Sequence, residues 1–290
     1  MLAQQNNYSN LSSAVGLGLV EFNENEIAVD YGCMFVDSFV YASRLCKRIV
    51  GIIPSSGRYN TLQKRLVEEG VENYDLVNAG YNEQHFKEVF DCVIINCFLE
   101  QILTEIKHNK SIFFDSKVSS SKKGDRPGKI RIGVLQVVYN GLRPGGILYI
   151  SYANKLRVNT LLSFTSLEIK SYFTSFSMRK ALNIISLVET ICLYSYYLIS
   201  QKGFEELLRA NGFTDIEKYA VFPDHKCPLK IMPLSKLAEC SFEPVQHPHR
   251  GGSLRRIYDG VKRRVDILIF NKFKLFGLSP SFIITARKAS

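Results

Sequence analysis

The stretch EIAVDYGCMFVDSFVYASR, Glu26 to Arg44, runs from a short apolar segment through Asp-Tyr-Gly-Cys into a helical pattern. This layout is typical of a strand, a ligand-binding turn and a helix. Turns of this kind usually carry two or three glycines, whereas this one has only Gly32, followed by Met34, Phe35 and Val36. The stretch therefore raises the question of whether the turn binds a cofactor in an unusual way or no longer binds one.

Alternation of strand and helix patterns continues outward from this stretch to residue 152. Short apolar runs at 48–53, 74–79, 90–98 and 147–152 predict four more strands after the one at 27–29, with helical patterns between them. Such alternation predicts a parallel sheet covered by helices on both faces. Ligands of these folds bind beyond the carboxyl ends of the strands, where the strand order reverses, which is where the turn at 30–36 would lie.

The second half of the chain completes this pattern after an interruption. Residues 153–200 are rich in aromatic side chains and predict a helical cap, and the segment 201–290 then returns to the core with strands at 216–222 and 281–287. We expect a core of residues 1–152, the cap, and a C-terminal part of the core. The predicted fold class is α/β: a Rossmann-like, doubly wound, mostly parallel seven-stranded sheet with an inserted helical cap.

One apolar stretch and the charge balance bear on location and partners. Residues Ala181–Ser200 are apolar but contain Glu189, and a central carboxylate is costly in lipid, so they predict a buried or interfacial helix and no transmembrane span. The net charge is +10, and residues 250–274 hold eight Lys or Arg against two Asp. This segment suggests an anionic surface or a partner protein, or simply a solvated face. Nucleic acid is a weaker hypothesis, because the segment has few aromatics and no recognition motif.

The seven cysteines form no C-x-x-C pair and several lie in apolar runs, which is typical of reduced thiols. The N-terminal residues lack the basic start and apolar core of a secretory signal. We therefore expect a cytoplasmic protein, with peripheral attachment to a membrane as an open alternative. Cys240, His247 and His249 have a zinc-like spacing but no evident fourth ligand, so no metal site is predicted.

Seven stretches, taken in order, point to a known family: AVDYGC, IVGIIPSSGRYNTLQKR, FDCVIINCFLEQI, LRPGGILYISYAN, YSYYLISQKGFEELLRANGF, YAVFPDHKCPLKIMPL and SPSFIITARK. Together they resemble class I S-adenosylmethionine-dependent methyltransferases. The resemblance is to a bacterial group encoded with surface-polysaccharide and glycan genes, and it covers most of the chain.

The resemblance implies a cofactor site for S-adenosylmethionine but also shows where this sequence departs from the family. It places Asp30, Gly32 and Cys33 in the cofactor turn and Asn96 and Phe98 at its border. Met34 and Val36 replace two family glycines, Ile53 replaces the acid that accepts both ribose hydroxyls, and Asn78 stands where relatives often carry an acid. At roughly 1.5–3 kcal/mol for each hydrogen bond to a charged group, losing two would weaken binding by roughly two to four orders of magnitude.

Asp224 and His225 are the candidate catalytic residues. In this fold the loop after the sixth strand faces the substrate, and methyl transfer needs alignment and often one base near the acceptor. The alternative that the sequence favours over a catalytic role is a surface turn with incidental polar residues. Two hypotheses remain: a methyltransferase for a small or glycan-linked acceptor, or a catalytically inactive methyltransferase-like module that binds a partner protein or an anionic surface.

Overall fold

The structure is a computed structural model, and it describes residues 12–80, 86–99, 126–154, 199–222, 228–236 and 281–290, with 264, 267, 268, 272 and 279. Most of the expected cap at 153–200 and most of the basic segment at 250–274 lie outside the described residues, so both stay predictions. Within the described ranges, no helix combines the length and apolar character that crossing a membrane requires.

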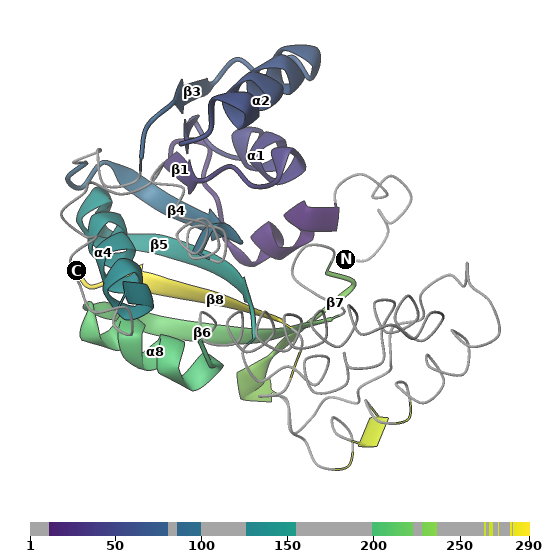
Figure 1. The fold of residues 1–290 in the computed structure, drawn as a ribbon, viewed down its shortest axis with the longest axis vertical. Helices are drawn as coiled ribbons and strands as arrows, with labels where there is room; N and C mark the ends of the chain where they lie inside the picture. Colours follow the sequence, from purple (N-terminus) through teal and green to yellow (C-terminus); the bar gives the residue numbers. More distant parts are fainter. Residues whose placement is uncertain are drawn as a thin grey trace, which may run out of the picture.

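The centre of the molecule is an eight-stranded sheet with the order β3-β2-β1-β4-β5-β8-β6-β7 (Figure 1). Strands β1 to β5 pair in parallel, whereas β8 is antiparallel to both of its neighbours, β5 and β6. The predicted α/β class with a mostly parallel sheet is confirmed, and the eighth strand is the short edge strand β7. The strands are β1 (Ile27–Tyr31), β2 (Arg48–Ile52), β3 (Tyr74–Val77), β4 (Phe90–Asn96), β5 (Leu142–Ala153), β6 (Phe213–Phe222), β7 (Lys230–Pro233) and β8 (Ser281–Lys288).

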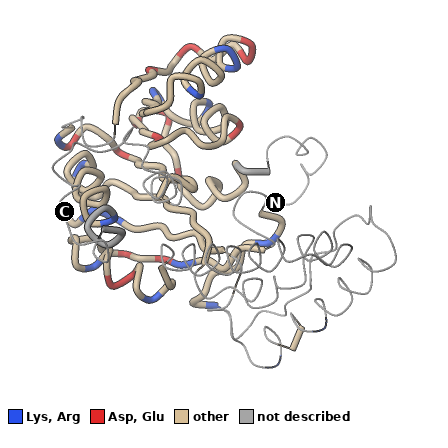
Figure 2. Tube along the Cα trace, in the orientation of Figure 1, with Lys and Arg blue, Asp and Glu red and all other residues tan. Residues whose placement is uncertain are grey.

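Helices cover both faces of this sheet, as the alternating pattern predicts. One apolar core joins the sheet to α4 and α8, and a second joins it to η2, α1 and α2. Among the described residues, Lys, Arg, Asp and Glu are frequent on helices α2 and α8, while the central strands carry few (Figure 2). The described helices are α1 (Val36–Ser43), α2 (Ser56–Glu68), α4 (Arg126–Gly141) and α8 (Gln201–Ala210), with the 3-10 helices η2 (Ser12–Leu19) and η6 (Leu234–Lys236).

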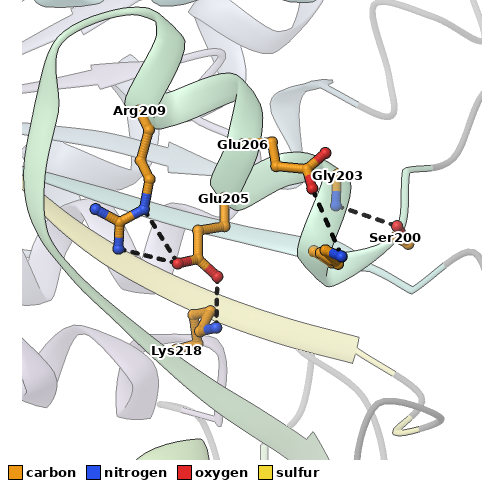
Figure 3. Close-up of polar contacts among 7 residues, drawn as sticks. Ser200, Gly203, Glu205, Glu206, Arg209 and Lys218 are labelled. Atoms are coloured by element: carbon orange, nitrogen blue, oxygen red, sulfur yellow. Dashed lines mark hydrogen bonds and ion pairs between the residues drawn. The ribbon is translucent and has the colours of Figure 1, made fainter.

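Local chemistry fixes where helix α8 begins and how it attaches to the sheet (Figure 3). The Ser200 hydroxyl accepts a hydrogen bond from the backbone N–H of Gly203 at 3.2 Å, which caps the first turn. On the same helix, Glu205 forms ion pairs with Arg209 at 3.0 Å and with Lys218 of β6 at 2.6 Å. These two cations lower the pKa of Glu205, Lys218 having the larger effect. The carboxylate thus ties α8 to the neighbouring strand.

Candidate functional site

The strand order reverses between β1 and β4, which makes their carboxyl ends the expected ligand site. From β1 the chain first builds outward to β2 and β3, and it then returns to form β4 on the other side of β1. Open α/β sheets bind ligands in the crevice that forms outside such a switch point. Asp30 lies opposite Ile94 in this pairing, so the turn after β1 and residues 97–98 after β4 lie at the same end of these two strands.

Asp30 is fully buried at the end of β1. Its Oδ1 accepts a hydrogen bond from the Cys33 N–H at 3.3 Å, while its Oδ2 is buried with no hydrogen-bond partner among the residues that the structure describes. Loss of hydration on burial raises the pKa of this carboxyl from 3.8 to about 8. The hydrogen bond from the Cys33 N–H lowers the pKa, but by less than burial raises it. The group is therefore mainly protonated at neutral pH, and it holds the turn by a neutral hydrogen bond.

Backbone conformation shows how a turn with a single glycine is formed. Gly32 has φ +92° and Cys33 has φ +43°, so the two left-handed positions directly follow the strand. Val36 begins helix α1, and Phe35 before it is extended. Positive φ therefore falls on Gly32 and Cys33 and not on Met34 or Val36, the two positions where the family has glycine. The residue that bears the strain is Cys33.

Phe98 lies directly against the turn. A Cβ atom built on Gly32 would be 2.2 Å from Cδ2 of the Phe98 ring, far inside any allowed contact. The ring is also buried beside Tyr31, with 6.4 Å between the two ring centroids. The side of Gly32 where a Cβ would stand is thus occupied by protein, and the Gly32 N–H is itself bonded to the Ile52 carbonyl at 2.8 Å.

The ends of β2 and β3 differ from the acidic ends that the resemblance implies. Ile53 is fully buried, and its N–H continues the ladder to the Val77 carbonyl at 2.8 Å. Asn78 donates a hydrogen bond to the Ser56 hydroxyl at 3.1 Å, so it has a partner within the protein. No described side chain takes the role of the ribose-binding acid at the position of Ile53.

A guanidinium group near the turn was missed by sequence reasoning. The Nη1 atom of Arg58, in the first turn of α2, lies 2.6 Å from the sulfur of Met34. Arg58 was noted only as part of a matching motif, because nothing in the spacing indicates that α2 would bring it over the β1 turn.

Asn96, predicted to border the cofactor, instead joins three elements within the core. Its amide donates to the Ser38 hydroxyl on α1 at 3.2 Å, and the Ser151 hydroxyl of β5 donates to its Oδ1. All three residues are buried. The network fixes α1 and β5 against β4 and does not present Asn96 at a surface.

The predicted catalytic pair, Asp224 and His225, lies outside the described residues, as do Cys240, His247 and His249. In the part of the chain that the structure does describe, no group of three His, Cys, Asp or Glu side chains could hold a metal ion. A hollow of about 330 Å³ lies between α1 and α2. Its lining belongs to these two helices and mixes both signs of charge; the lining residues are Val36, Asp37, Thr61, Lys64, Arg65 and Glu68.

Comparison with known proteins places the fold. No family model matches the chain, and no curated protein matches its sequence. Two solved structures of a Haemonchus contortus phosphoethanolamine N-methyltransferase 2 are similar to it. One, with phosphomonomethylethanolamine and S-adenosylhomocysteine, has a TM-score of 0.51 at 14% identity. The other, with S-adenosyl-L-methionine, has a TM-score of 0.50 at 15% identity.

Each comparison covers 95% of this chain but only 52% of the other, so the chain spans about half the length of these structures. At such identities the likeness concerns the fold. The chain has the fold of the class I S-adenosylmethionine-dependent methyltransferases.

Proposed function

We propose that the protein is an S-adenosylmethionine-dependent methyltransferase that acts in the cytoplasm on a small or glycan-linked acceptor. The observation that carries the proposal is the left-handed turn at Gly32 and Cys33, held by Asp30 at the switch point of a class I methyltransferase sheet. Two solved structures of similar fold are complexes with S-adenosylhomocysteine or S-adenosyl-L-methionine, which supports this cofactor. The resemblance to enzymes of surface-polysaccharide genes supports the glycan-linked acceptor.

The described residues fit this cofactor only in part. Asp30, Gly32 and Cys33 supply the turn, but Ile53 offers the ribose no acceptor, and Phe98 occupies one side of Gly32. In this conformation the site does not fit S-adenosylmethionine, so we derive no chemical step through it. Asp224 and His225 remain the proposed acid–base residues for the acceptor.

The same two features favour a second candidate function. A catalytically inactive methyltransferase-like module would keep the buried core and turn while losing the ribose acceptor and filling the crevice, as Ile53 and Phe98 do. Such a module would bind a partner protein or an anionic surface through the basic segment 250–274.

Calorimetric titration with S-adenosylmethionine and with S-adenosylhomocysteine separates the two candidates. Micromolar binding of either ligand supports the methyltransferase, whereas no heat at millimolar ligand leaves the inactive module. Adenosine is the matched control ligand, because it lacks the methionine part that would lie at the β1 turn. Titration with generic RNA at rising salt completes the test, since binding through phosphate contacts falls steeply with salt.

A further inference from the structure

We infer that one exposed helical surface of the chain docks onto an anionic phospholipid bilayer. This surface, called the docking face below, is formed by Arg264, Ile267, Leu268 and Lys272. The inference rests on the second candidate function and deepens it, because it names the anionic surface that the basic segment 250–274 binds. It does not depend on methyl transfer.

Two large apolar side chains of the docking face are exposed next to each other. Ile267 is 39% exposed and Leu268 is 45% exposed. The short piece that holds them, yellow-green in Figure 1, lies apart from the sheet. Apolar side chains exposed singly are ordinary on a protein surface, whereas those exposed together indicate a site of contact. The other large apolar side chains exposed in the described part of the chain are single ones: Val15, Val67, Ile132 and Leu229.

A cation lies about one helical turn to either side of this apolar pair. All four residues of the docking face have helical backbone, and both Arg264 and Lys272 are exposed. Residues three or four positions apart are neighbours on the surface of a helix, so both cations adjoin Leu268. The long stems of Arg and Lys lie along apolar surface while their charged heads reach polar surroundings. The docking face thus combines an apolar centre with two positive ends.

Charge and apolar exposure together favour an anionic bilayer as the partner. The segment 250–274 carries eight Lys or Arg against two Asp, within a chain of net charge +10. Each Lys or Arg close to an anionic leaflet strengthens binding about fivefold, and apolar side chains of such a helix enter the layer beneath the headgroups. A polyanion such as RNA matches the charge but offers no apolar layer, so it would leave Ile267 and Leu268 in water.

Tryptophan fluorescence tests the docking face directly, because the chain contains no tryptophan. Leu268→Trp places a sole tryptophan on the docking face, and Val67→Trp places it on α2 at a control position that is 69% exposed. Each full chain is titrated with vesicles of equal parts phosphatidylserine and phosphatidylcholine, and with vesicles of phosphatidylcholine alone. We expect the emission of Leu268→Trp to move to shorter wavelength with the anionic vesicles only, and that of Val67→Trp to stay unchanged. No shift in Leu268→Trp, or an equal shift in both variants, would overturn the docking face.

Co-sedimentation with the same vesicles separates the apolar and the charged contribution. The double variant Ile267→Ser/Leu268→Ser should bind at least about tenfold more weakly than the unchanged protein. The double variant Arg264→Gln/Lys272→Gln should bind about 30-fold more weakly, and Val67→Ser should bind as the unchanged protein does. Full binding by the serine double variant would overturn the docking face, because charge alone would then account for the attachment.

Heparin, a polyanion without an apolar layer, distinguishes failure of the docking face from failure of the second candidate function. A protein that binds heparin but neither kind of vesicle would overturn the docking face and leave an anionic partner of another kind. A protein that binds neither heparin nor vesicles would overturn the docking face together with the anionic-surface form of the second candidate. The titration with S-adenosylmethionine decides the methyltransferase candidate independently of both results.

Discussion

The substitution Asp30→Asn tests the buried carboxyl at the centre of the site. Asparagine has nearly the same shape, and its Oδ1 can still accept the Cys33 N–H, but it cannot ionise. In the unfolded chain the Asp30 carboxyl has its ordinary pKa of 3.8, whereas in the folded protein burial raises the pKa to about 8. Between these values the unfolded state binds fewer protons, so the stability of the Asp30 protein falls as pH rises.

The size of the effect follows from the same two pKa values. Each pH unit between them costs about 1.4 kcal/mol of the free energy of unfolding. From pH 5 to pH 7 the protein with Asp30 should lose about 3 kcal/mol relative to Asp30→Asn. This is a large share of the roughly 5–15 kcal/mol that stabilises an ordinary domain. Because the difference in the free energy of unfolding between the two proteins is compared across pH, any pH-independent destabilisation by the new amide cancels.

Urea unfolding followed by circular dichroism at pH 5, 6, 7 and 8 measures this difference. Glu72→Gln, which neutralises an exposed carboxyl, is the control and should leave the pH dependence as it is. The reasoning is refuted if Asp30→Asn and the unchanged protein show parallel stability curves over this range, because the carboxyl would then ionise normally in the folded state.

Three other predictions concern the helix anchor and the turn. Glu205→Gln should lower the free energy of unfolding at pH 7 by about 0.5–1 kcal/mol. Because the pKa of Glu205 is lowered in the folded state, the loss should be fully present above the ordinary pKa of 4.5 and should disappear as the pH falls through the lowered pKa. The control Glu206→Gln, at a side chain that is 67% exposed, should have no effect. An equal loss of stability in both variants would contradict the role of Glu205 as an anchor. Ser200→Ala should cost about 1 kcal/mol in urea unfolding through the lost helix cap, and a neutral result would contradict the cap. Gly32→Ala should prevent stable folding or lower the melting temperature sharply. Gly70 also has positive φ, but a Cβ built there meets open space, so Gly70→Ala should cost only about 1 kcal/mol of the free energy of unfolding. Equal shifts in melting temperature would contradict the close contact at Gly32.

The parallel part of the sheet could be predicted from sequence because each strand is a short apolar run bounded by turn residues. FDCVIIN of β4 and IAVDY of β1 are such runs. The edge strand β7 was missed because KIMP is only four residues long and ends in proline, which makes the segment resemble a linker. Strand β5 begins at Leu142, five residues earlier than expected. Gly145 has positive φ, and the pairing of β5 with β4 shifts register around it, so the strand continues through this glycine.

The residues at the ends of β1, β2 and β4 could be named from sequence, but their contacts could not. Asp30 and Gly32 follow from the strand–turn–helix pattern, and the absence of an acid at Ile53 is evident in the residue itself. The contact of Phe98 with Gly32 depends on the left-handed backbone of Cys97, which no local pattern indicates. The Asn96 side chain similarly lies in the core because of hydrogen bonds with Ser38 and Ser151, which are 58 and 55 residues away in the chain.

Photo-cross-linking with radiolabelled S-adenosylmethionine, followed by peptide mapping, tests the central claim most directly. Ultraviolet light attaches the bound ligand to residues that it touches, without any need for turnover. If the crevice between β1 and β4 is the cofactor site, label should appear in peptides that contain residues 30–37 or 94–98, and excess S-adenosylhomocysteine should abolish it. Label confined to other peptides, or unaffected by the competitor, would contradict a cofactor site at this switch point.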